Sequence, residues 1–117
     1  MRDYQVAELP VVDSIGEADW ETLARNMLRA ELMRRGLSYA KLVEALAAIG
    51  VDETEAAIKN KVARGRFTMV FFIQAMAAIG ADWLRMPGMV AIGRGEGLGV
   101  GGAQMLAKRG PTPSSAA

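Results

Sequence analysis

Apolar residues recur at helical spacing in four stretches of the chain, and residues that begin or end helices separate these stretches. The first stretch has Asp19 as its N-cap and Gly36 as its stop. Its apolar side is expected to carry Trp20, Leu23, Ala24, Met27 and Leu28. Glu31 falls within that side, and a buried carboxylate needs a partner. We therefore predict an ion pair between Glu31 and either Arg64 or Arg66.

The second and fourth stretches begin and end alike. Ser38 is expected to cap a helix that runs to Ile49, and Thr68 is expected to cap one that runs to Ile79. A glycine follows each helix as its C′ residue. The predicted inward side chains are Leu42, Leu46 and Ile49 in the second helix, and Phe72, Met76 and Ile79 in the fourth. The two ends, ALAAIGVD and AMAAIGAD, agree at six of eight positions. This reflects either an internal duplication or, as we favour, a shared way of ending a helix.

The helix between them, residues 53–64, starts with acids and finishes with bases. Asp52 and Glu55 fit a D-x-x-E capping box, and charges of these signs complement the helix dipole at both ends. Ile58 and Val62, four residues apart, define the predicted inward side together with Thr54. The opposite side carries Glu53, Ala56, Asn60, Ala63 and Arg64, and its flanks carry Lys59 and Lys61.

That outward side has the chemistry of a helix that lies in the major groove of DNA. Alanine allows close approach and contacts thymine methyl groups, asparagine bonds adenine at two atoms, and lysine or arginine reaches phosphates. We expect base contacts from Ala56, Asn60 and Arg64. We expect phosphate contacts from Tyr39, Lys59, Lys61, Arg66 and Thr68. Thr68 opens a helix N-terminus, whose free N–H groups suit an anion. Alternatively, alanine stands there as the best helix former and the lysines only solvate the surface.

The order of these elements resembles a known class of DNA-binding domain. A helix, a short turn and a helix, flanked by one helix on each side, form the layout of lambda-repressor-like, Xre-type helix-turn-helix domains. More closely, the runs RNMLRAELMRRGLSYAKL, TEAAIKNKVARGRF and FFIQAMAAIG are similar to a bacterial family known only as a domain of unknown function. The matching elements are Arg25-Asn26, Ala30-Glu31-Leu32, Arg35-Gly36, Ser38-Tyr39, Thr54-Glu55, Asn60-Lys61, Arg64-Gly65, Phe67, Phe71-Phe72 and Ile79-Gly80. The resemblance covers about residues 20–80 and implies the fold, and DNA binding follows from it by analogy between folds.

Several features depart from the Xre pattern. The second helix is nearly a turn longer, and the inward pair of the third helix is spaced by four residues instead of three. Acidic Asp52, Glu53 and Glu55 stand where such domains often have polar or basic residues. Glutamate can accept a hydrogen bond from cytosine, whereas acids lower nonspecific affinity for DNA.

The composition limits the chain to one small domain with tails. It has 117 residues and a net charge of +1, and residues 20–86 carry ten Lys and Arg against seven Asp and Glu. Eight of the thirteen glycines follow Pro87, and such a segment does not build a core. We predict an irregular segment over residues 1–18, a helical domain over 19–86 and a flexible Gly-rich tail over 87–117. The expected fold is all-α, a small four- to five-helix, lambda-repressor-like helix-turn-helix domain with disordered N- and C-terminal tails.

The fourth stretch, MVFFIQAMAAI, is apolar almost all round, which is typical of a helix buried on every side. In a domain of four helices its outward strip needs a cover. This strip consists of Val70, Gln74, Ala77 and Ala78. Trp83 and Leu84 can fold back over it, or a second subunit can cover it, as in repressor-type domains that bind DNA as dimers. A helical protein-interaction or homodimerisation module without DNA binding is therefore the alternative function.

Catalysis is not expected of this chain. It has no histidine and no cysteine, so it lacks ordinary nucleophile–base pairs, disulfides and thiolate metal sites. Gly97, Gly99 and Gly102 fit G-x-G-x-x-G, but a dinucleotide site requires a second strand and an acid further on, which do not follow here. We expect no cofactor, no metal and no small-molecule substrate. With no signal peptide or membrane span predicted, the leading hypothesis is a cytoplasmic, dimeric protein of transcriptional-regulator type that binds double-stranded DNA.

Overall fold

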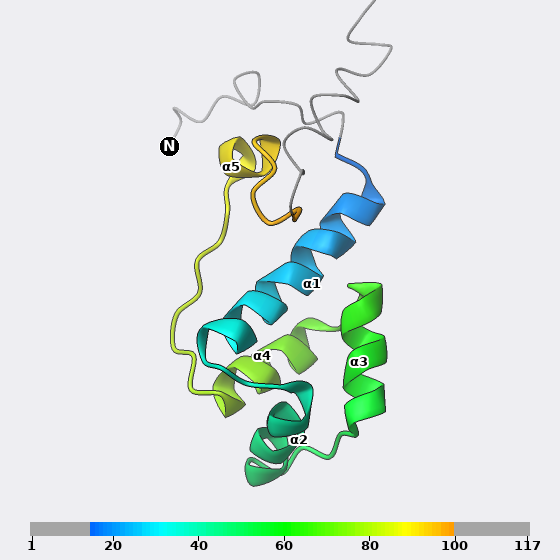
Figure 1. Cartoon of the computed structure of the whole chain (residues 1–117), viewed down its shortest axis with the longest axis vertical. Helices are drawn as coiled ribbons and strands as arrows, with labels where there is room; N and C mark the ends of the chain where they lie inside the picture. The colour runs from blue at the N-terminus through cyan, green and yellow to red at the C-terminus, as the bar shows by residue number, and fades with distance from the viewer. Residues whose placement is uncertain (1–14, 100–117) are drawn as a thin grey trace, which may run out of the picture. The chain divides into compact units, whose positions relative to one another are not determined.

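Helices form all the regular structure in the part of the chain that the computed structural model describes, residues 15–99. In chain order they are α1 (Glu17–Arg34), α2 (Tyr39–Ala48), α3 (Glu55–Arg64), α4 (Met69–Ala78) and α5 (Met89–Gly93) (Figure 1). The predicted all-α fold is confirmed. The disordered tails predicted from composition lie largely outside the described residues, at 1–14 and 100–117. Among the described helices, none combines the length and the hydropathy that crossing a bilayer demands.

The chain divides into two units. One comprises Glu21–Arg85 and holds α2, α3, α4 and most of α1. The other comprises Met1–Trp20 and Met86–Ala117, and its described residues include α5. Helix α5 therefore lies within the stretch for which composition predicts a flexible tail. The apolar run ahead of the clustered glycines is helical, whereas a G-x-G-x-x-G fingerprint follows a strand.

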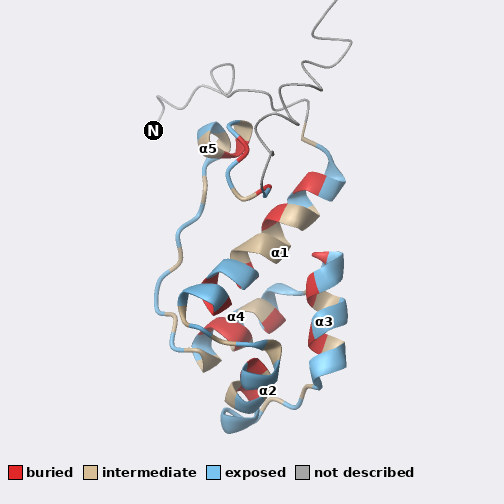
Figure 2. Cartoon of the chain, viewed as in Figure 1, coloured by how far each residue is buried: buried red, intermediate tan, exposed pale blue. Residues whose placement is uncertain are grey.

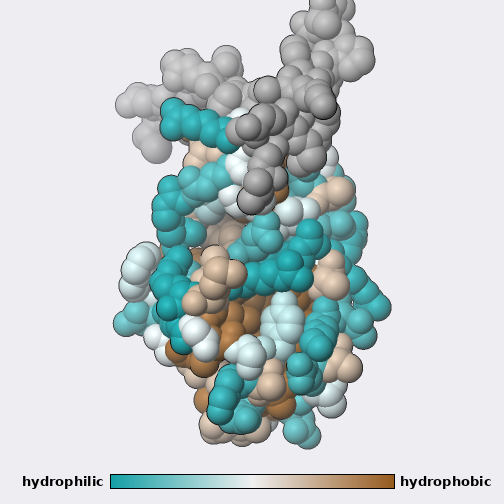
Figure 3. Space-filling view, in the orientation of Figure 1, coloured by the Kyte–Doolittle hydropathy of each residue, from teal (hydrophilic) through white to brown (hydrophobic). Residues whose placement is uncertain are grey.

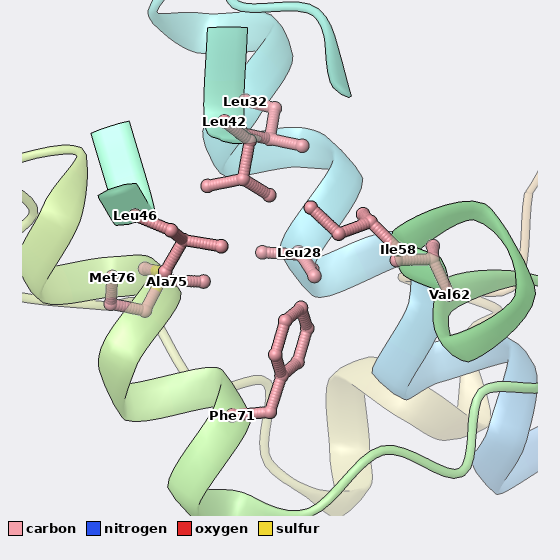
Figure 4. Packing of buried hydrophobic residues seen from close by; sticks show 9 residues of the cluster. All are labelled: Leu28, Leu32, Leu42, Leu46, Ile58, Val62, Phe71, Ala75 and Met76. Carbon is pink, nitrogen blue, oxygen red and sulfur yellow. The ribbon is translucent and has the colours of Figure 1, made fainter. Parts of the chain in front are cut away.

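The core of the Glu21–Arg85 unit forms where four helices meet (Figure 4). Its buried members are Leu28 and Leu32 of α1, Leu42 and Leu46 of α2, Ile58 and Val62 of α3, and Phe71, Ala75 and Met76 of α4. Burial of each large apolar side chain stabilises the fold by about 1.5–3 kcal/mol. Helix α2 contacts both α3 and α4, and the buried positions face inward on these helices (Figure 2). This core fixes which side of α3 points outward.

Three of the helices begin at a capping hydroxyl. Ser38, Thr54 and Thr68 each accept a hydrogen bond from the backbone N–H three residues on, at 3.2, 3.1 and 3.0 Å. The caps at Ser38 and Thr68 confirm the prediction, whereas the capping box at Asp52 is wrong. The end of α2 is closed by a backbone bond from Val51. The residues after Val51 connect α2 to α3, so α3 starts only after Thr54.

Helices α2 and α4 end in the same way. Gly50 and Gly80 follow them with φ of +84° and +79°, and the N–H of the next residue bonds to the carbonyl five residues earlier. These bonds join Val51 to Leu46 and Ala81 to Met76, both at 2.9 Å. The same bonds at both ends give the octapeptide match a local physical reason.

Helix α1 starts earlier than predicted. It begins at Glu17, and the Asp19 carboxylate accepts a hydrogen bond from the Gly16 N–H at 2.9 Å. This is the returning half of a capping box, in which a residue in the first turn satisfies the amide that precedes the helix. Leu28 is buried as predicted, whereas Trp20, predicted inward, is 41% exposed.

Glu31 is buried as predicted, with 3% of its surface exposed, but its partners are not those predicted. One carboxylate oxygen accepts from Arg34 at 2.7 Å and the other from Arg35 at 2.6 Å. The predicted partners, Arg64 and Arg66, are wrong because Arg34 at the end of α1 and Arg35 just after it already reach both oxygens. Among the described residues, every buried side-chain nitrogen and oxygen has a hydrogen-bond partner.

The inward side of α4 is rotated from its predicted position. Phe71, Ala75 and Met76 are buried, whereas Phe72, predicted inward, is only partly buried against the core. A helix that is apolar almost all round has no polar side to set its orientation. The loop residue Phe67 contacts both rings, edge-on to Phe71 at 5.8 Å and stacked on Phe72 at 6.1 Å between centroids. These aromatic contacts help to set the orientation of α4.

Candidate nucleic-acid interface

The outward side of α3 presents a row of exposed side chains. Ala56, Asn60 and Arg64 are all exposed, and because they are four residues apart they lie one above another along the helix. On the opposite side, Ile58 and Val62 are 0% exposed. The core therefore holds the helix so that all three predicted base-contact residues share one outer surface.

The polar members of this row are available to a ligand. Within residues 15–99, no hydrogen bond or ion pair engages the Asn60 amide or the Arg64 guanidinium. Ala56 and the neighbouring Ala63, which is also exposed, add only methyl groups. The side chains at the centre of the face are therefore small enough for another molecule to approach the helix closely.

The cations predicted to contact phosphates are paired with carboxylates of the protein. The pairs are Lys59 with Glu55 at 3.4 Å, Lys61 with Glu53, and Arg66 with Glu21. The Glu55–Lys59 pair could be predicted from the sequence, because the two residues have i, i+4 spacing on a helix. The other two pairs join residues that are not helical neighbours, so sequence spacing alone does not reveal them.

These ion pairs differ in how firmly they hold the cation. Lys59 and its partner Glu55 are 60% and 48% exposed, and such exposed pairs contribute only about 0–1 kcal/mol. Arg66 is 61% exposed, but its partner Glu21 is only 24% exposed. Lys61 is less exposed, its partner Glu53 is mostly buried, and its Nζ lies 4.5 Å from the centroid of the Phe71 ring. Lys59 can therefore exchange its carboxylate for a phosphate more readily than Lys61 can.

The two hydroxyl groups predicted to contact phosphates stand at helix N-termini. Thr68 caps α4 by accepting a hydrogen bond from the Phe71 N–H. Tyr39, the first residue of α2, packs against the core and accepts a hydrogen bond from Arg29 Nε at 3.2 Å. Each hydroxyl still has its own hydrogen to donate to an acceptor such as a phosphate oxygen.

The C-terminal end of α3 is fixed to α1. Gly65 is buried with φ of +64°, and a Cβ at this position would lie 2.1 Å from the Glu21 carbonyl oxygen. One residue before α3 ends, the Ala63 carbonyl accepts a hydrogen bond from Arg25 Nη1 at 2.8 Å. Nothing in the spacing of Arg25 predicts this contact, because the two residues are 38 positions apart. Together these contacts hold the outward face of α3 at a set angle to α1.

Helix α4 carries a second exposed surface, which is apolar. Of the residues predicted to need a cover, Val70 and Ala77 are exposed, and Gln74 and Ala78 are half-buried. Trp83 and Leu84 are the two residues of this chain predicted to fold back over the strip. Leu84 packs against the core, whereas Trp83 is 69% exposed. Much of the strip therefore faces solvent.

Residues 20–84 match the sequence model of a protein family that is described as a domain of unknown function (DUF6471). The chain belongs to this family. The DUF6471 domain takes in most of α1 and all of α2, α3 and α4, so the outward faces of α3 and α4 both lie within it. The predicted resemblance to a family of unknown function is thereby confirmed. No curated protein and no solved structure matches the sequence.

Proposed function

We propose that this protein binds double-stranded DNA as a transcriptional regulator, with the outward face of α3 in the major groove. The observation that supports the proposal is the row formed by Ala56, Asn60 and Arg64. The row is exposed, lies on one side of a helix, and carries an amide and a guanidinium that no described residue engages. Helices α2 and α3, joined by residues 49–54, follow one another in the order of a helix-turn-helix motif.

Each residue of the row suits a particular base edge. The Asn60 amide fits adenine N6 and N7, the Arg64 guanidinium fits guanine O6 and N7, and the Ala56 methyl group fits the methyl of thymine. Residues four apart rise about 6 Å along a helix, while successive bases on one strand are about 3.4 Å apart. The row therefore matches a short run of neighbouring base pairs.

The flanking charges determine how strongly random DNA would bind. The carboxylates of Glu55 and Glu21 compete with phosphates for Lys59 and Arg66, and they repel phosphates nearby. The unit from residue 21 to 85 carries ten Lys and Arg against seven Asp and Glu. Such a small excess gives low nonspecific affinity, so binding depends on the base contacts.

Replacing Asn60 by Ala tests the proposal. A target site is first selected from a random DNA pool with the wild-type protein, and affinities are then measured by fluorescence anisotropy at low and moderate salt. We expect Asn60→Ala to weaken binding to the selected site by about 5- to 150-fold, which corresponds to about 1–3 kcal/mol for a bidentate base contact. Binding to random DNA stays unchanged, because Asn60 contacts no phosphate.

A matched control removes a cation from outside the α3 face. Arg85 is exposed and follows α4, so Arg85→Ala should leave the preference for the selected site intact. The proposal fails if the wild-type protein enriches no sequence, or if Asn60→Ala binds the selected site as tightly as the wild type does.

A further inference from the structure

Helix α4 and the residue Trp83 form an exposed apolar surface. Met69, Val70 and Ile73 are 69%, 65% and 58% exposed, and Ala77 continues the row. Trp83, beyond the end of the helix, is 69% exposed. On the face drawn in Figure 3, hydrophobic residues gather in the middle of the unit that contains α4, with hydrophilic residues around them. An apolar cluster with a polar rim is typical of a surface that another molecule covers.

The same residues border an open groove. Its volume is about 300 Å³, and Met69, Ile73, Ala77, Asp82, Trp83 and Leu84 are among the residues that line it. Asp82 is the one charged side chain on the lining, at the end of the groove that follows α4. Helix α4 itself carries no charged residue from Met69 to Ala78. The surface therefore has an uncharged middle and a carboxylate beyond the C-terminal end of the helix.

We propose that this surface binds a second copy of the same chain, with the two α4 helices packed antiparallel across a two-fold axis near Ile73. A two-fold interface places only the residues on its axis beside their own counterparts, so a charge in its middle would face a like charge. The uncharged α4 avoids that repulsion. With Ile73 on the axis, the long Met69 side chain of one copy faces the small Ala77 of the other.

Charge complementarity favours the same arrangement. Antiparallel packing brings the end of one α4 beside the start of the other, so Asp82 of one copy approaches the N-terminus of α4 in the second copy. A helix N-terminus carries a partial positive charge that a carboxylate stabilises. Both ends of the interface gain this contact, because the two-fold axis repeats it.

The size of the surface sets the expected affinity. A helix of ten residues is about 15 Å long, and α4 with Trp83 offers less than the roughly 800 Å² per partner of a standard interface. We therefore expect a reversible dimer with a dissociation constant in the micromolar range. The proposed dimer forms through α4 and not through the outward face of α3, so it can be tested independently of DNA binding.

Sedimentation equilibrium of the full chain without DNA, from low micromolar to several hundred micromolar, tests the dimer. The wild type should shift from monomer to dimer over this range, whereas Ile73→Glu should remain a monomer because two carboxylates would meet at the axis. The exposed position of Ile73 lets the variant fold, which circular dichroism verifies. Met33→Glu is the matched control, because Met33 is 78% exposed and lies on α1, away from the proposed interface. This variant should dimerise like the wild type.

Cross-linking gives a second readout that does not rely on a destabilising change. The chain has no cysteine, so Ile73→Cys introduces a single thiol. Oxidation should join two chains through position 73, and Met33→Cys should cross-link much less. A wild type that stays monomeric at every concentration, or an Ile73→Glu variant that dimerises like the wild type, would overturn the proposal.

Discussion

At Gly65 the backbone of α3 comes into contact with the backbone of α1, and there is no room for a side chain between them. A Cβ would lie 2.1 Å from the Glu21 carbonyl oxygen. That oxygen is a main-chain atom and the backbone of residue 65 fixes the Cβ, so neither yields by a change of rotamer. The positive φ of +64° adds the strain of the left-handed region. A single residue thus couples the end of one helix to the start of another.

Substitution of this glycine should be far more damaging than substitution of a similar glycine elsewhere. We expect Gly65→Ala to lower the free energy of unfolding by about 2–5 kcal/mol, which combines backbone strain with overpacking. Gly80 has a comparable φ of +79° but no atom within 4 Å of a Cβ, so Gly80→Ala should lower it by only about 1–2 kcal/mol. Urea denaturation followed by circular dichroism measures both, and equal losses would contradict the role of the α1–α3 contact.

At the scale of a helix, the start of α3 shows that two residues with the right chemistry can compete for the N-cap. Asp52 has Glu55 three residues on, as a capping box requires, but it is the Thr54 side chain that accepts a hydrogen bond from the first turn, at the Ala57 N–H. The bond from Val51 that closes α2 decides between them. The position of one helix start therefore follows from the end of the previous helix.

The two candidate caps should differ in their effect on stability. We expect Thr54→Ala to lower the free energy of unfolding by about 1 kcal/mol, the usual effect of losing an N-cap. Asp52→Ala should change it by less than about 0.5 kcal/mol, as is usual for an exposed surface residue. Thermal or urea unfolding of the two variants compares these losses directly. A larger loss for Asp52→Ala than for Thr54→Ala would indicate that Asp52 is the N-cap.

Sequence patterns predict features that depend on nearby residues. The caps at Ser38 and Thr68 and the inward pair on α3 are confirmed, because a hydroxyl before a helix and two aliphatics one turn apart act locally. The orientation of α4 is not predictable in this way, since its side chains are almost all apolar. Its orientation depends on Phe67, which lies in the loop ahead of it, and on the other helices.

The same limit applies to the candidate site. The row of Ala56, Asn60 and Arg64 follows from the inward pair of α3 by helical geometry, and the structure places the row on one exposed face. The Arg66–Glu21 ion pair and the Arg25 contact join segments far apart in the chain. Only the packing of α1 against α3 brings those groups together, so sequence spacing does not reveal them.

At the scale of the whole molecule, charge is balanced locally as well as in total. The net charge of the chain is +1, and each predicted phosphate-binding cation has a carboxylate beside it. Under the proposed function these carboxylates suppress binding to random DNA more than binding to a preferred site. Selectivity would then come partly from the acids of α3 and α1.

Removal of one such acid should raise affinity and reduce selectivity. Glu55 is about half exposed and pairs with Lys59, so Glu55→Gln releases the lysine with little effect on the fold. We expect binding to random DNA to strengthen by a factor of about two to five at low salt, in line with the small energy of an exposed pair. Glu44→Gln, which frees the exposed Lys41 on α2, is the comparison. Anisotropy titrations should show the larger gain for Glu55→Gln, and no gain would count against a phosphate role for Lys59.

The backbone contact between α1 and α3 also bears on how easily the surface of this protein can be diversified. Gly65 and the Ala63 carbonyl anchor α3 through main-chain atoms, so the side chains on its outer face take no part in the anchoring. Randomising positions 56, 60 and 64 together would therefore yield a library whose members share one backbone. Such a library explores recognition independently of folding, which makes the domain a compact scaffold for selecting new binding specificities.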